Sequence, residues 1–103
     1  MRIHLTAPHL PRGEQLLELA RRRAGFALDR FGDLVRDLEI RLRDVNGPRG
    51  GPGIACLTRL RLTTGGGVVA ESSACTPEVG IALALERLAG RLRRQVSRHQ
   101  DHR

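Results

Sequence analysis

Four arginines near the C-terminal end of the chain share a helical spacing. Arg87, Arg91, Arg94 and Arg98 follow one another at intervals of four, three and four residues. At about 100° per residue, these positions fall within an arc of about 60° on one side of a helix. We call these four residues the arginine row. Because a planar guanidinium group matches phosphate oxygens two at a time, such a row is typical of a surface that contacts RNA.

The segment that carries the arginine row has the pattern of an amphipathic helix. Thr76 is suited to cap its N-terminus, Pro77 to its first turn, and Glu78 to the positive end of the helix dipole. We predict a helix from Pro77 to about Arg98, followed by a frayed tail at residues 99–103. A separate apolar stripe should face the core, made of Ile81, Leu85, Leu88, Leu92 and Val96.

Length and charge narrow the possible functions. The chain has 103 residues, which predicts a single domain spanning residues 1–103. All 18 basic side chains are arginine, and the formal net charge is +7. Such a charge attracts nucleic acids, acidic proteins or anionic membranes. Only two residues are aromatic, so the core must be aliphatic.

Several classes of function lack the residues that they require. No segment has the length of a membrane span or the apolar core of a signal peptide, so we expect a cytoplasmic protein with reduced thiols at Cys56 and Cys75. We find no pairing of a nucleophile with a base, no phosphate-binding loop and no cofactor motif, and therefore expect no enzyme. We also expect no metal site, because no metal-ligand spacing is formed by His4, His9, His99 and His102.

The remaining elements predict the fold class. Residues 2–6 alternate as a short strand, and apolar positions from Leu16 to Phe31 recur at helical spacing before Gly32. Three further strands are expected near residues 38–43, 54–63 and 68–74, with a hairpin tip at residues 46–53. Alternation in the first of these strands should turn Leu38, Ile40 and Leu42 toward the core. The order β-α-β-β-β-α predicts a two-layer α+β sandwich, in which two helices cover one face of a four-stranded sheet. A right-handed crossover would make the first strand parallel to its neighbour.

Other arginines are expected on both layers. Arg22 and Arg23 point away from the apolar stripe of the first helix, and Arg30 lies near its end. On the open face of the sheet, we expect cross-strand charge pairing among Glu39, Arg41, Arg43, Arg59 and Arg61.

Several features together resemble a bacterial family. They are the element order, Arg30-Phe31 closing the first helix, the hairpin Asp44-Val45-Asn46-Gly47-Pro48-Arg49-Gly50-Gly51 with Cys56 beyond it, and the pattern of Ala84, Arg87, Leu88, Arg91 and Leu92. With these features the chain resembles a short form of the ribosome hibernation promoting factors. That family includes ribosome-associated inhibitor A and is also called the sigma-54 modulation or ribosomal subunit interface proteins.

The resemblance implies a fold like that of double-stranded RNA-binding domains. It also implies binding to rRNA in the small ribosomal subunit, where the family overlaps the mRNA path and the tRNA anticodon ends and blocks translation under stress. Family basic positions fall on Arg87, Arg91, Arg94 and Arg98, and on Arg22, Arg23 and Arg30. The oligomeric state, and any effect on ribosome pairing, stay open.

Two alternatives remain. One is a structured-RNA-binding module that acts off the ribosome. The other is a basic protein-interaction domain with Leu57 and Leu83 as its exposed apolar residues. The RNA-binding hypothesis requires the guanidinium groups of the arginine row to lie together without carboxylate partners. It also predicts that replacing the row by serine leaves thermal stability nearly unchanged.

Overall fold

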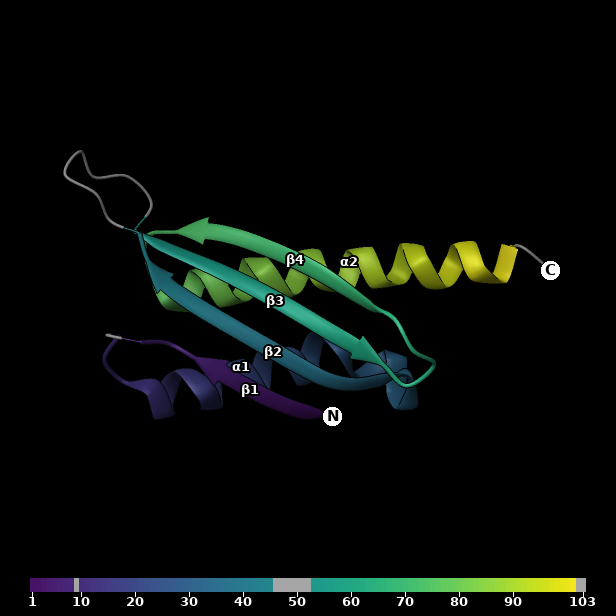
Figure 1. Cartoon of the computed structure of the whole chain (residues 1–103), viewed down its shortest axis with the longest axis horizontal. Coiled ribbons are helices and arrows are strands. Elements are labelled where there is room, and N and C mark those ends of the chain that lie inside the picture. The colour runs from purple at the N-terminus through teal and green to yellow at the C-terminus, as the bar shows by residue number, and fades with distance from the viewer. Residues whose placement is uncertain (9, 46–52, 102–103) are drawn as a thin grey trace.

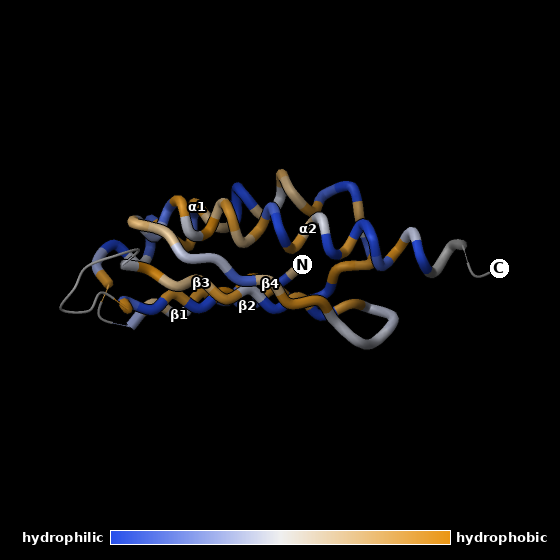
Figure 2. The backbone as a smooth tube through the Cα atoms, turned by 90° about the horizontal axis from the view of Figure 1, so that it is seen from above, coloured by the Kyte–Doolittle hydropathy of each residue, from blue (hydrophilic) through white to orange (hydrophobic). Residues whose placement is uncertain are grey.

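A four-stranded sheet positions every other element. Its strands run in the order β1 (Arg2–Thr6), β2 (Val35–Asp44), β3 (Ile54–Leu62) and β4 (Gly67–Ala74). The helices α1 (Gly13–Leu28) and α2 (Pro77–Asp101) form a second layer on one face of this sheet (Figure 1; Figure 2). The computed structural model describes residues 1–8, 10–45 and 53–101. The predicted two-layer α+β sandwich is confirmed, with β1 parallel to β2 and the other neighbouring strands antiparallel.

The core lies between the two layers and is aliphatic. Strand alternation sends Leu38, Ile40 and Leu42 of β2 inward, as predicted, where they join a core cluster with apolar side chains of both helices. One buried residue of β3, Thr58, is polar. Its hydroxyl donates a hydrogen bond to the Ala70 carbonyl at 2.7 Å, so the core accepts this polar side chain without an unpaired group.

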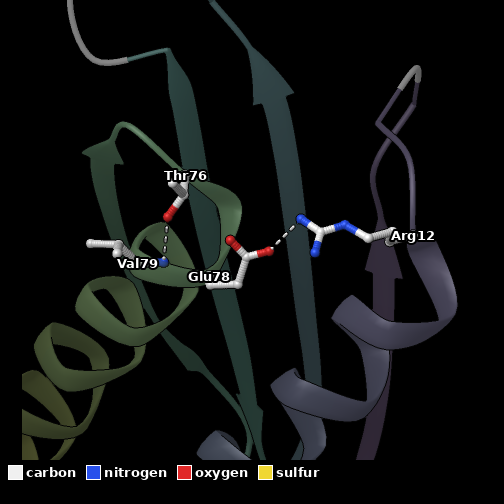
Figure 3. Close-up of polar contacts among 4 residues, drawn as sticks. All are labelled: Arg12, Thr76, Glu78 and Val79. Carbon is white, nitrogen blue, oxygen red and sulfur yellow. Dashed lines mark hydrogen bonds and ion pairs between the residues drawn. The ribbon is translucent and has the colours of Figure 1, made fainter.

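Side chains fix the start of α2 to its surroundings. The Val79 amide donates to the hydroxyl of Thr76 at 3.2 Å, which confirms Thr76 as the N-cap (Figure 3). Beside this cap, the Arg12 guanidinium forms an ion pair with Glu78 at 2.8 Å and links the N-terminal ends of the two helices. The buried hydroxyl of Ser72 donates to the Gly80 carbonyl at 2.7 Å, which ties the first turn of α2 to β4.

Two helix boundaries differ from the prediction. The α-helical pattern stops at Leu28, and a 3₁₀ segment, η1 (Asp29–Leu34), carries the chain through Phe31 to β2. Gly32, with φ 52°, provides the left-handed residue within that segment. Helix α2 extends to Asp101, three residues beyond the predicted Arg98. Residues 46–52 of the predicted hairpin tip lie outside the described residues. Next to them, the Val45 amide donates a hydrogen bond to the Gly53 carbonyl at 2.8 Å.

The two cysteines differ in environment. Both are free thiols, Cys56 buried against the start of α2 and Cys75 exposed before it. Burial raises the pKa of the Cys56 thiol from 9.0 to about 12.

Alkaline pH should therefore destabilise the fold through Cys56. Between pH 9.0 and about pH 12, the unfolded chain releases this proton and the folded protein keeps it. Since the unfolded state then binds fewer protons, the free energy of unfolding should fall by about 1 kcal/mol per pH unit. The chain has no Lys or Tyr to obscure the effect. The free energy of unfolding, measured with urea, should differ between wild type and Cys56→Ala by an amount that shrinks as the pH rises. The control Cys75→Ala should show the same pH dependence as wild type. If the free energies of unfolding of wild type and Cys56→Ala fall in parallel with pH, the effect does not come from the Cys56 thiol.

Candidate nucleic-acid interface

The arginine row lies on the flank of α2 that meets the outer edge of the sheet. All four of its side chains are exposed. The Arg87 guanidinium donates from Nη1 to the Glu71 carbonyl at 2.8 Å, and the Arg91 guanidinium donates from Nη1 to the Val69 carbonyl at 2.6 Å. Because β4 is an outer strand, the carbonyls on its free edge have no strand partner. The two arginines therefore cap a sheet edge from the helix above it.

The two hydrogen bonds fit because helix and strand repeat over similar lengths. Four helical residues separate Arg87 from Arg91, a rise of about 6 Å. Two strand residues separate Glu71 from Val69, a distance of about 7 Å. Each guanidinium can therefore reach its own carbonyl, and the pair is held in a fixed arrangement along the edge of β4.

The arginine row keeps its positive charge. A backbone carbonyl is neutral, and a guanidinium group that gives one N–H to it still has four N–H donors. Among the described residues, the ion pairs are Arg12–Glu78, Arg36–Asp37 and Arg41–Glu39, and none of them involves the row. The arrangement thus meets the requirement that the row lie together without carboxylate partners.

The second half of the row lies on a part of α2 that projects beyond the sheet. Arg91 already reaches Val69, only two residues from the start of β4 at Gly67. The helix continues to Asp101 and runs past the end of the strands (Figure 1). Arg94 and Arg98 are therefore exposed cations with no hydrogen bond within the described part of the chain.

The arginines near the N-terminal half form a separate group. Arg22 and Arg23 are exposed on α1, whereas Arg30 belongs to η1, where its guanidinium lies 5.1 Å from the centre of the Phe31 ring. Helix α1 packs beside α2 and β1, and the row faces the free edge of β4. The helix layer therefore carries basic residues at two places, and the structure does not bring the seven predicted residues into one continuous row.

The open face of the sheet has a different charge arrangement. Asp37 of β2 stands between Arg2 of β1 and Arg61 of β3 in the strand register. Glu39 stands in the same way between His4 and Arg59, and also pairs with Arg41 at 2.8 Å. Of the predicted cross-strand pairing, the register confirms only Glu39 opposite Arg59. Arg43 lies opposite Ala55, and the ion pair that Glu39 forms, with Arg41, runs along β2. Carboxylates are thus interleaved with the sheet arginines, and the helix layer presents the less compensated positive charge.

Two residues of the helix layer were missed from the sequence. Arg93 is exposed and follows Ala89 by four residues, which puts it on the side of α2 that faces α1. Phe26 is 95% exposed, although it is one of only two aromatic residues. The helical period would have identified both, since Phe26 lies well off the stripe formed by Leu16, Ala20 and Ala24.

The described residues contain no group of three or more His, Cys, Asp or Glu side chains placed to hold a metal ion. None of the helices in the described part of the chain combines the length and apolar character needed to cross a lipid bilayer.

Comparison with known proteins gives a match in structure but not in sequence. No protein-family model matches the sequence, and no curated protein matches it. The structure of a ribosomal subunit interface protein from Coxiella burnetii superposes with a TM-score of 0.73, over 94% of this chain and 99% of that one. The two proteins share a fold. Their sequences are 15% identical, so the match concerns the arrangement of helices and strands.

The edge-capping hydrogen bonds change the expected effect of mutating the arginine row. From sequence alone, all four residues are expected to be dispensable for stability. We now expect the double variant Arg87→Ala/Arg91→Ala to lose about 1 to 2 kcal/mol, because two carbonyl hydrogen bonds from charged donors disappear. This loss would lower the melting temperature by several degrees in a domain of this size. Arg94→Ala/Arg98→Ala removes the same charge and should melt like wild type; equal melting of both double variants would contradict the edge-capping role.

Proposed function

We propose that this protein binds the small ribosomal subunit in the channel used by mRNA and tRNA, and that it blocks translation as a hibernation factor. The observation that carries the proposal is the arginine row, exposed and without carboxylate partners among the described residues. The row lies on a fold shared with a protein described as a ribosomal subunit interface protein.

In this proposal, the protein acts by occupancy and performs no reaction. Arginine contacts with the rRNA phosphates release condensed counterions, which supplies affinity and makes it depend on salt. Such contacts position a protein without reading base sequence. The shape of the folded rRNA channel would then provide specificity, as it does for many proteins that recognise structured RNA.

The other two functions remain outcomes of the test. A module that binds structured RNA off the ribosome would use the same arginines but would not prefer ribosomal subunits. The protein-interaction hypothesis has less support, because Leu57 and Leu83 are both half-buried and do not form an exposed apolar patch.

Sedimentation with purified small subunits tests the proposal. We expect the protein to pellet with the subunits at low salt and to remain in the supernatant at high salt. Arg94→Ser/Arg98→Ser should weaken this binding by at least tenfold, because it removes two phosphate contacts and leaves the edge of β4 capped.

The matched control is Arg59→Ser/Arg61→Ser, which lowers the net charge by the same amount on the open face of the sheet. Its binding should stay close to that of wild type. If wild type fails to pellet at low salt, the ribosomal function is excluded. If both double variants weaken binding equally, overall charge and not the arginine row is responsible.

A further inference from the structure

Phe26 projects from α1 almost entirely into solvent. It is 95% exposed, whereas the other exposed large hydrophobic residues in the described chain reach 50% at most. An isolated apolar side chain on a protein surface is ordinary. Phe26 differs because its ring stands between two hollows that both carry arginines, and because its exposure means that it adds nothing to the core.

One of these hollows, of about 320 Å³, lies between α1 and α2. Small apolar side chains from both helices line it: Ala27, Ala82 and Ala89. Arg23 and Glu86 supply its polar groups. A second, shallower hollow beside the ring is lined by Arg21, Arg22 and Asp29.

We propose that Phe26 is the stacking platform for an unpaired RNA base, which enters the hollow between α1 and α2. The ring would hold the face of the base, and Arg23 and Arg22 would contact the flanking phosphates. This inference rests on the proposed function, and it adds a base-contacting residue to a surface otherwise described by phosphate contacts.

Area and charge favour a base over an apolar protein partner. An aromatic side chain offers about 150 to 250 Å² of surface, far below the area that a stable protein interface buries on each partner. A single base needs no more than one ring. The adjacent run Arg21-Arg22-Arg23 has no carboxylate partner among the described ion pairs, so it complements the phosphates on either side of that base.

Glu86 adds a preference among the bases. A carboxylate accepts hydrogen bonds from an exocyclic amino group, which cytosine, adenine and guanine carry and uracil lacks. Since Glu86 lines the same hollow as Phe26, a stacked base can direct its amino group toward this carboxylate. The subsite should therefore favour cytosine, adenine or guanine over uracil.

The absence of tryptophan makes stacking directly measurable. The chain has no Trp or Tyr, so Phe26→Trp introduces a single fluorescent reporter at an exposed position. We expect its emission to be quenched by a single-stranded oligocytidine, less by an oligouridine of equal length, and not by an abasic oligomer with the same phosphates. Thr6→Trp, exposed on β1 at the edge of the sheet away from the arginine row, is the control and should show no quenching.

Affinity provides the second readout. Phe26→Ala should weaken oligocytidine binding by about tenfold and leave binding of the abasic oligomer unchanged. Glu86→Ala should make oligocytidine and oligouridine bind alike. Both residues are exposed, so unchanged melting temperatures are expected for these variants.

The outcomes separate this inference from the proposed function. If the protein binds RNA and small subunits, but Phe26→Trp is not quenched and Phe26→Ala binds as wild type does, base stacking is overturned and the arginine contacts stand. If wild type binds neither RNA nor subunits at low salt, both proposals fail.

Discussion

The central interaction of this structure is the donation of arginine N–H groups to neutral backbone carbonyls. Arg87 and Arg91 reach Glu71 and Val69 on the free edge of β4 and are held there without losing their charge. A carboxylate partner would fix a guanidinium equally well, but it would cancel the charge that a polyanion requires. The same two bonds also occupy carbonyls that another strand could otherwise pair with. One pair of side chains therefore caps the sheet edge and also keeps its positive charge.

This arrangement divides the molecule into two electrostatically different layers. On the sheet face, the strand register alternates cations with Asp37 and Glu39. In the helix layer, the arginine row and the α1 arginines have no carboxylate partner among the described ion pairs. The layer with uncompensated charge also carries the exposed ring of Phe26. A nucleic acid approaching this protein would thus be attracted to the helices, with phosphate contacts available on both of them.

Much of the fold could be predicted because its signals are local. Strand alternation identified Leu38, Ile40 and Leu42 as buried, and capping chemistry placed the start of α2 at Thr76. The α1 boundary was wrong because a 3₁₀ turn keeps Phe31 near the apolar stripe and imitates a longer helix. For the site, sequence spacing predicted that the arginine row shares one flank. It could not predict that Arg87 and Arg91 meet β4, since that contact joins residues 16 and 22 positions apart through the tertiary packing.

The salt dependence of binding tests the central claim most directly. The dissociation constant for small ribosomal subunits should be measured over a range of salt concentrations for wild type and Arg94→Ser/Arg98→Ser. Four to six phosphate contacts predict a log–log slope of association of about −3 to −5 for wild type, and losing two contacts should make it shallower by about 1.5. Arg59→Ser/Arg61→Ser should retain the wild-type slope. Identical slopes for wild type and Arg94→Ser/Arg98→Ser would show that the projecting end of α2 makes no phosphate contact, and would contradict the account.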